Sequence, residues 1–118
     1  MAENNIIQTK LYDFALQIIK IYKKLKYEKK EFELASQLLR CGTSIGANIE
    51  EGIGGQSKKD FIAKFQIALK KSRETYYWCR LLLDSEILDK SAGKKLLNDC
   101  NELIKIPTSI LKSSISNS

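Results

Sequence analysis

The sequence predicts an all-α protein: an antiparallel, up-down-up-down four-helix bundle that forms one domain over residues 1–118. Apolar residues recur at steps of three and four almost throughout, and the alternation typical of half-buried strands is absent. The chain contains only one proline, Pro107. Four amphipathic helices joined by short links can bury their apolar stripes only against one another, which favours the bundle.

The first two helices are predicted at about residues 5–25 and 31–53, with a short charged link between them. Each carries one apolar stripe for the core. The first stripe consists of Leu11, Phe14, Ile18, Tyr22 and Leu25, and the second of Ala35, Leu38, Gly42, Ile45, Ile49 and Ile53. A glycine inside a helix costs about 0.5–1 kcal/mol relative to alanine, so Gly42 and Gly46 predict a closely packed neighbouring helix.

The third and fourth helices are predicted at about residues 57–84 and 90–111. Ser57 begins the third helix, because its hydroxyl can accept a hydrogen bond from an early backbone N–H. Core positions of these helices are Phe61, Phe65, Ala68, Ser72, Thr75, Cys79 and Leu82, then Leu96, Leu97, Cys100, Leu103, Ile104 and Ile110. Pro107 is expected to bend the fourth helix or end it early, and residues 112–118 are expected to fray.

The composition indicates a moderately basic cytoplasmic protein. Lys and Arg number 20 against 14 Asp and Glu, a net charge of +6, which favours RNA, DNA or acidic protein surfaces as partners. The alternative is that the excess serves only solubility. The three cysteines are widely spaced and odd in number, as expected of core side chains in a reducing cytosol. No signal peptide or membrane-spanning run is present, so we expect no membrane partner.

Catalysis is not expected, because the chain has no histidine to act as a general base near neutral pH or as a metal ligand. We therefore predict no catalytic residues, no cofactor, no metal and no small-molecule substrate. The glycine-rich segment at 52–60 lacks the P-loop pattern and follows a helix, so it is interpreted as a helix–helix turn. A lone phosphate at the start of the third helix, near Lys58 and Lys59, stays open as an alternative.

The third helix carries a second apolar stripe that a monomeric bundle does not need. Its members lie away from the core stripe, with Glu74 among them: Ala63, Ile67, Trp78 and Leu81. An apolar patch that contains tryptophan on an outer side predicts a contact between subunits. The alternative is that the fourth helix or the tail covers Trp78.

The second helix has a polar stripe opposite its apolar one, made of Gln37, Arg40, Ser44, Asn48 and Glu51. Arg40 and Asn48 could hold a phosphate or an RNA base edge. We favour a structural interpretation: the stripe is solvated, or Arg40 and Asn48 belong to a network with Glu51 and Glu74 in which Arg40 meets one of these carboxylates across a helix interface.

Basic residues gather near the end of the first helix and along the third. The predicted nucleic-acid contacts are Lys23, Lys24, Lys26, Lys29, Lys30, Arg40, Lys58, Lys59, Lys64, Lys70, Lys71 and Arg73. Such contacts would be mainly to phosphates, so affinity should fall steeply with salt. The alternative is an ordinary solvated face.

Several short motifs between residues 31 and 83 carry a family resemblance. They are Gln37-Leu38-Leu39-Arg40, Ser44-Ile45, Asn48-Ile49, Glu51-Gly52, Ser57, Asp60-Phe61, Ile67-Ala68 and Ser72 to Glu74. The chain resembles the four-helix-bundle proteins of 23S rRNA intervening sequences, a family that includes accessory proteins of diversity-generating retroelements. The resemblance implies a bundle that assembles into a ring, typically a pentamer, with a basic surface. In the retroelement branch it implies binding to a reverse transcriptase and structured RNA.

The preferred hypothesis is a non-enzymatic homo-oligomer that binds RNA or an RNA-handling protein such as a reverse transcriptase. The alternative is a structural or protein-interaction scaffold without affinity for nucleic acid.

Overall fold

Four α-helices account for most of the chain that the structure describes, which is residues 2–116, with side chains from Ile6 onward. In this computed structural model the first helix ends in a short π-helical segment, η1, and no strand occurs between residues 2 and 116. The elements are α1 (Ala2–Lys23), η1 (Lys24–Glu28), α2 (Phe32–Ile53), α3 (Lys58–Asp84) and α4 (Lys90–Ser116). The all-α prediction is confirmed.

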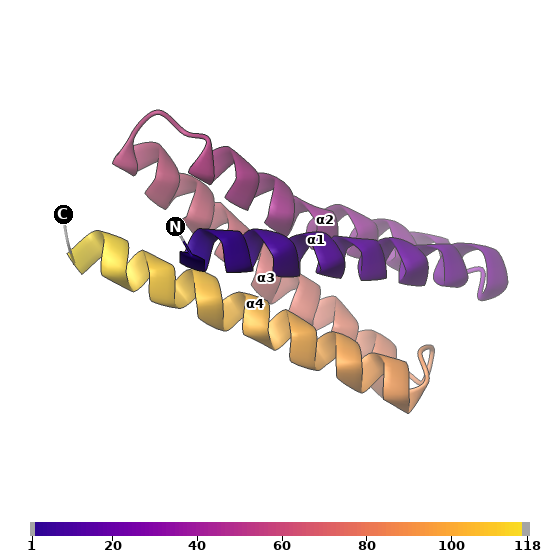
Figure 1. The fold of residues 1–118 in the computed structure, drawn as a ribbon. Helices are drawn as coiled ribbons and strands as arrows, with labels where there is room; N and C mark the ends of the chain where they lie inside the picture. Colours follow the sequence, from indigo (N-terminus) through magenta and orange to yellow (C-terminus); the bar gives the residue numbers. More distant parts are fainter. Residues whose placement is uncertain (1, 117–118) are drawn as a thin grey trace.

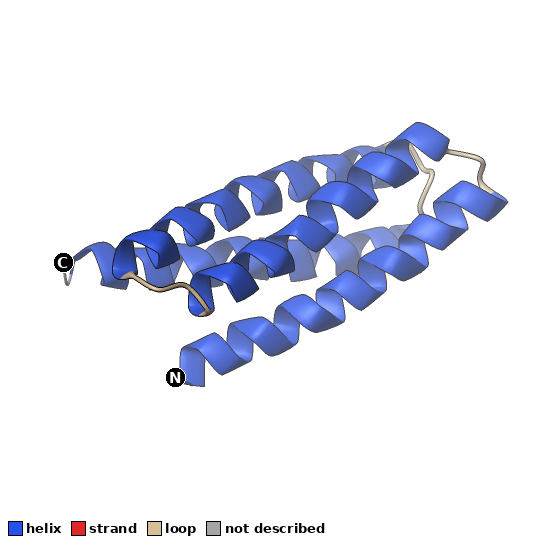
Figure 2. Cartoon of the chain, turned by 90° about the horizontal axis from the view of Figure 1, so that it is seen from above, coloured by secondary structure: helices blue, strands red, loops and turns tan. Residues whose placement is uncertain are grey.

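The helices run alternately up and down along a bundle that measures 47 × 21 × 20 Å (Figures 1 and 2). Consecutive helices pack extensively, whereas α1 and α4 contact each other less. Figure 1 shows these two ribbons diverging from the N-terminus toward the end of the bundle where α4 begins. The two chain ends therefore lie at one end of the bundle, and η1 lies at the other.

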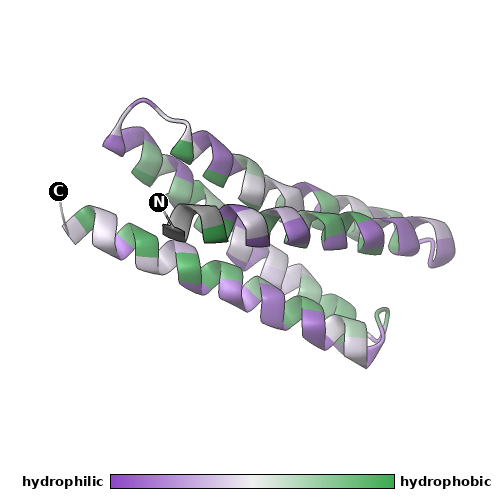
Figure 3. Ribbon diagram, viewed as in Figure 1, coloured by the Kyte–Doolittle hydropathy of each residue, from purple (hydrophilic) through white to green (hydrophobic). Residues whose placement is uncertain are grey.

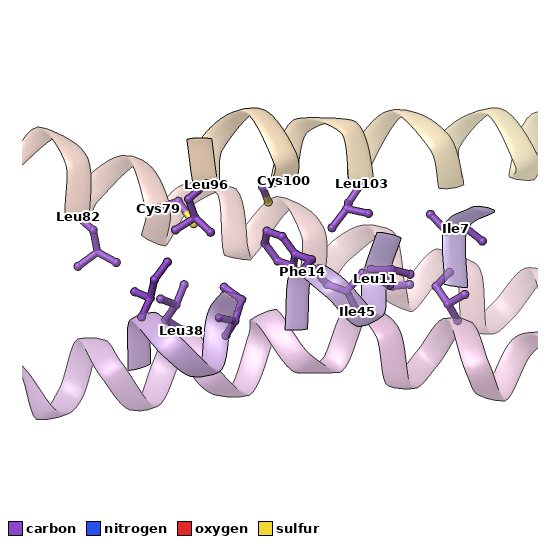
Figure 4. Packing of buried hydrophobic residues seen from close by; sticks show 14 of the residues in the cluster. Ile7, Leu11, Phe14, Leu38, Ile45, Cys79, Leu82, Leu96, Cys100 and Leu103 are labelled. Atoms are coloured by element: carbon purple, nitrogen blue, oxygen red, sulfur yellow. The ribbon is translucent and has the colours of Figure 1, made fainter. Parts of the chain in front are cut away.

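The core lies where the four apolar stripes meet, and most residues of the predicted stripes are buried, whereas Ile53, Phe61, Leu97, Ile104 and Ile110 are half-buried. Leu11, Phe14 and Ile18 of α1 are buried against residues of the other helices, while Tyr22 is half-buried. Figure 4 shows Phe14 and Leu11 pointing between the neighbouring helices. Colouring by hydropathy shows green and purple segments alternating along each helix, as amphipathic helices require (Figure 3).

Three glycines mark close approaches between helices, and at one of them, Gly52 of α2, a Cβ atom would lie 3.0 Å from Phe65 Cδ1 of α3. A Cβ atom at Gly42 would lie 3.0–3.1 Å from three side-chain atoms of Ile18, and one at Gly93 would lie 2.6 Å from Leu83 Cδ1. At Gly46 the same atom would meet Leu11 Cβ at 3.6 Å, an ordinary contact. The predicted close packing is therefore found at Gly42, whereas Gly46 has room for a methyl group.

The first helix continues further than predicted. Residues 26–28, expected in a link, belong to η1, where Lys29 N–H donates to the Lys24 carbonyl at 3.1 Å, five residues back. Leu25, the last residue of the predicted stripe, lies in this segment and is buried, as expected. The connection to α2 is only three residues long and contains Lys30 at a φ of 59°.

The fourth helix also continues further than predicted, because Pro107 does not end it. Proline has no N–H, so the carbonyl four residues earlier, that of Leu103, loses its helical donor. The buried Ser72 hydroxyl of α3 lies 3.5 Å from this carbonyl and donates to it, while also bonding the Ala68 carbonyl at 3.0 Å. The predicted fraying is wrong for residues 112–116, which are helical, and 117–118 lie outside the described residues.

Both later helices begin at side-chain caps. Ser57 Oγ accepts from the Asp60 N–H at 3.1 Å, which confirms the predicted start of α3. Asp89 Oδ1 accepts from the Ala92 N–H at 2.7 Å and caps α4 in the same way. This second cap was not predicted from the sequence.

The three thiols are buried in the core on three different helices, Cys41 on α2, Cys79 on α3 and Cys100 on α4. Burial raises the pKa of each thiol, and that of Cys100 to about 12.

At pH 8 the native protein is therefore expected to react with a disulfide reagent such as DTNB roughly 10³-fold more slowly than the unfolded chain, because the thiolate is the nucleophile. Absorbance measurements with and without guanidinium chloride test this. All three thiols should react promptly only after unfolding, and one rapidly reacting thiol in the native protein would contradict the prediction.

Candidate functional site

The second apolar stripe of α3 is only partly covered by the bundle. Ala63, Ile67 and Leu81 are exposed, and Trp78 is half-buried against the core. Trp78 Nε1 donates to Glu74 Oε2 at 3.3 Å, and the Tyr77 ring meets the indole edge-on with centroids 5.6 Å apart. The stripe lies on the side of α3 that faces α2, because Lys64, Lys71 and Trp78 follow at steps of seven and Lys64 pairs with Glu51 of α2 at 2.7 Å.

The predicted polar network does not form as one unit within the described chain. Glu51 pairs with Lys64, and Glu74 contacts Lys71 at 3.7 Å and Trp78. Asn48 Nδ2 donates to the Ser44 carbonyl, one turn earlier on the same helix. Glu51 lies three turns from Arg40 along α2, about 16 Å away, so the lysines of α3 reach these carboxylates first.

Arg40 is consequently exposed, and its guanidinium makes no ion pair between residues 6 and 116. Arg40 therefore forms no ion pair with Glu51 or Glu74 inside the described chain. Arg40 remains a cation available to a partner.

The predicted nucleic-acid contacts fall at separate places on the surface. Lys23, Lys24, Lys26, Lys29 and Lys30 surround η1 at one end of the bundle, whereas Lys58 and Lys59 begin α3 at the other. Lys26 is held by a 3.1 Å hydrogen bond to Tyr22 Oη, which raises its pKa, and its ammonium lies over the Tyr22 and Tyr27 rings. Lys64 and Lys71 pair with carboxylates. The structure thus does not unite the predicted set into one surface.

Two of the predicted residues, Lys70 and Arg73, belong instead to a different basic surface, which was not predicted from the sequence. On α3 they share one line with Tyr77 and Arg80, at steps of three and four residues. On α4 a matching line contains Lys94, Asn98, Asn101 and Lys105. All of these residues except the half-buried Asn101 are exposed.

The contacts between α3 and α4 show that the two lines of residues lie side by side, at the same height along the bundle axis. Ser72 lies beside Leu103, and Gly93 lies beside Leu83, so Lys70 is level with Lys105 and Arg80 is level with Lys94. We call this surface the basic face and define it by its cations, Lys70, Arg73, Arg80, Lys94 and Lys105.

Most carboxylates of these two helices lie on other sides. On α4, Glu102 pairs with Lys10 of α1 at 2.7 Å, and Asp99 pairs with Lys95 at 2.8 Å on the same side of the helix. On α3, Glu74 lies on the side that faces α2, whereas Asp84, four residues after Arg80, ends the same line without an ion pair to any of its cations. Within the described chain no cation of the basic face has an ion-pair partner. An uncompensated row of cations favours an anionic ligand.

The sequence held a signal for this surface. Arg73 and Arg80 are seven residues apart, and Lys94 and Lys105 are eleven apart, spacings that place each pair on one side of a helix. Arg80 and the lysines of α4 were missed because α4 was interpreted only through its apolar stripe.

The described residues offer no cluster for metal binding. No group of three or more Cys, Asp or Glu side chains among them could hold a metal ion. A groove of about 860 Å³ separates α1 from α4, with Phe14, Ile21 and Leu103 among its lining residues and the Lys10–Glu102 ion pair across it. Across residues 2–116, no helix is both long and apolar enough to cross a membrane.

The fold and this surface define the class of protein: a basic four-helix bundle with apolar side chains left on its outside. The model of the 23S rRNA-intervening sequence protein family matches residues 3–109, and the chain belongs to that family. A crystal structure of a protein of unknown function from the S23 ribosomal protein family of Bacteroides thetaiotaomicron is similar. The two chains are 44% identical with a TM-score of 0.90, over 93% of this chain and 98% of that one. No curated protein matches the sequence.

Proposed function

We propose that this protein is a non-enzymatic cytoplasmic homo-oligomer that binds structured RNA through the basic face. The observation that carries the proposal is the set of five cations on α3 and α4 that have no carboxylate partner among the described residues. They extend along about 15 Å of helix, since ten to eleven residues rise 1.5 Å each. Guanidinium and ammonium groups in such a row contact phosphates in register.

Exposed uncharged side chains between these cations favour RNA over an anionic partner that offers only negative charge. Tyr77 is exposed in the middle of the α3 line and offers a ring on which an unpaired base can stack. Asn98 and Asn101 supply amides that can bond to base edges or to 2′-hydroxyl groups. Structured RNA with unpaired loops presents a partner for each: phosphates for the cations, base faces for Tyr77, and base edges and 2′-hydroxyl groups for the asparagines.

Assembly would multiply this surface. Ile67, Trp78 and Leu81 form the proposed subunit contact, and the family resemblance described above implies a pentameric ring. Each added subunit contributes a further basic face, so the ring would bind a large RNA at several points. An RNA-handling protein such as a reverse transcriptase would then be a second partner of the same assembly.

Titration of the protein with a structured RNA at two salt concentrations tests the proposal. Five phosphate contacts to a single strand predict a slope of log K against log salt of about −3.5 per subunit. Absence of binding at low salt would leave the second candidate, a protein-interaction scaffold, which the exposed Trp78 stripe favours.

A further inference from the structure

The basic face has two uncharged side chains at its centre, Tyr77 on α3 and Asn98 on α4. The two helices run antiparallel (Figure 1), so each step forward along α3 corresponds to a step back along α4. Lys70 and Lys105 are level with each other, as the contacts between α3 and α4 show. Tyr77 lies seven residues after Lys70, and Asn98 lies seven residues before Lys105. Tyr77 and Asn98 therefore lie side by side, at the same height along the bundle axis.

A pair of cations lies on each side of this centre. Lys70 and Lys105 form the first pair, about 10 Å away along the helices. Arg80 and Lys94 form the second pair, about 5 Å away in the opposite direction. A strand of stacked nucleotides advances about 3.4 Å per nucleotide, so the distance between the two pairs corresponds to roughly four nucleotides. Beyond the second pair, the Asp84 carboxylate ends the α3 line and would repel a further phosphate.

The Tyr77 ring is exposed but held in place. Its side chain is 56% exposed, and one edge of its contact surface is taken by the Trp78 indole, 5.6 Å away between ring centroids. Trp78 is itself fixed by its hydrogen bond to Glu74. A ring that is already positioned loses little conformational freedom when a ligand binds. It can stack on an unpaired base, whereas a base inside a duplex has both faces covered by its neighbours.

The Asn98 amide is free to bind a ligand. It has no hydrogen-bond partner within the described chain, and its side chain is exposed. Asn48 of α2 differs in this respect, because its amide donates to the Ser44 carbonyl at 2.8 Å. A free amide presents an N–H donor next to a carbonyl acceptor. It is therefore complementary to a base edge on which an acceptor lies next to an amino group.

From this arrangement we infer that Tyr77 and Asn98 form a nucleobase site for one unpaired adenine, with the two cation pairs holding the phosphates of the flanking nucleotides. The inference rests on the proposed binding of RNA and specifies the ligand of the basic face. Adenine stacks on Tyr77, its N6 amino group donates to the Asn98 carbonyl, and N7 or N1 accepts from the Asn98 amide.

Adenine is favoured over the other bases because both its Watson–Crick and its Hoogsteen edge present an acceptor next to the N6 amino group. Guanine presents two acceptors, N7 and O6, on its Hoogsteen edge. Guanine, cytosine and uracil can each satisfy the amide with the Watson–Crick edge alone. A purine also covers more of the Tyr77 ring than a pyrimidine does.

A set of RNA hairpins tests the base preference of the full-length protein. The hairpins share one stem and differ only in the two central bases of a four-base loop: UAAU, UGGU, UCCU and UUUU. Fluorescence anisotropy near 0.1 M salt measures each dissociation constant. The UAAU hairpin is expected to bind about tenfold more tightly than the UUUU hairpin, the effect of one bidentate base contact. AMP in large excess should not displace it, because AMP carries a single phosphate.

Two substitutions separate stacking from recognition of the base edge. Tyr77→Ala should weaken the binding of the UAAU hairpin about tenfold, and Tyr77→Phe, which retains a ring, should restore it. Asn98→Ala should remove the preference, so that the four hairpins bind within about twofold of one another. Both side chains are exposed, so the fold should be unaffected, and circular dichroism checks this.

Tyr12→Ala is the matched control, because Tyr12 is a comparably exposed tyrosine on α1, away from the basic face. It should bind all four hairpins as the wild type does. An equal loss of affinity in Tyr12→Ala and Tyr77→Ala would contradict stacking at the nucleobase site.

The possible outcomes distinguish this site from the proposed function. If no hairpin binds at low salt, both the proposed binding of RNA and the nucleobase site are wrong. If all four hairpins bind equally well, RNA binding stands and only the nucleobase site is rejected. Tightest binding of UGGU would assign the base edge to an arginine of the basic face and reject Asn98, and displacement by AMP would identify a free nucleotide as the ligand and reject the site as one for RNA.

Discussion

Replacement of Gly42 by leucine is expected to lower the free energy of unfolding by about 3 kcal/mol or more, since overpacking a filled core costs roughly 1–3 kcal/mol even for smaller insertions. A Cβ at this position would already lie 3.0–3.1 Å from Ile18, and three further carbon atoms would have no space between α1 and α2. Urea unfolding followed by circular dichroism measures the change.

Gly46→Ala is the matched control on the same helix, because its methyl group would meet Leu11 Cβ at 3.6 Å. This variant is expected to be more stable than the wild type by about 0.5–1 kcal/mol, the difference in helix propensity. Equal destabilisation by the two substitutions would mean that α1 does not approach α2 most closely at Gly42.

Reversal of two charges on the basic face, Arg73→Glu with Lys105→Glu, is expected to weaken the binding of structured RNA at least tenfold near 0.1 M salt. Loss of two phosphate contacts should also make the salt slope shallower by about 1.4 per subunit, at roughly 0.7 per contact. Both side chains are exposed and without ion-pair partners in the described chain, so the fold should be unaffected. Filter binding at several salt concentrations measures both quantities.

Lys23→Glu with Lys29→Glu is the control, because it changes the net charge by the same amount, from +6 to +6 − 4 = +2, at the η1 end of the bundle. It should reduce affinity much less. An equal loss in the two double variants would show that RNA responds to total charge, and would reject the basic face as the binding surface.

The helices and their buried stripes could be predicted from the sequence because helical periodicity is a local property. Phe14 and Ile18 are buried as expected, and the Ser57 cap begins α3. That α4 does not end at Pro107 involves a contact distant in the sequence: the Ser72 hydroxyl of α3 lies 3.5 Å from the Leu103 carbonyl, which Pro107 leaves without its helical donor. No pattern around Pro107 contains that information.

The spacing of its cations places each pair on one side of a helix, but the assembly of the basic face could not be predicted, for a related reason. It depends on which side of α3 meets α4, and on Glu102 being drawn toward Lys10 of α1, which removes a carboxylate from the neighbourhood of Lys105. The Arg40 network failed because two lysines of α3 reach Glu51 and Glu74. Pairing among exposed charges is decided by the packing of helices, and the sequence shows only their order.

The position of the chain ends at one end of the bundle has a practical consequence for counting subunits (Figure 1). A short glycine-serine tether can join the end of α4 in one copy to the start of α1 in the next, since about ten such residues span roughly 17 Å on average and the bundle is 20–21 Å wide. Genes that encode two, three or more tethered copies would fix the stoichiometry covalently, and the tether would lie far from the turn between α1 and α2.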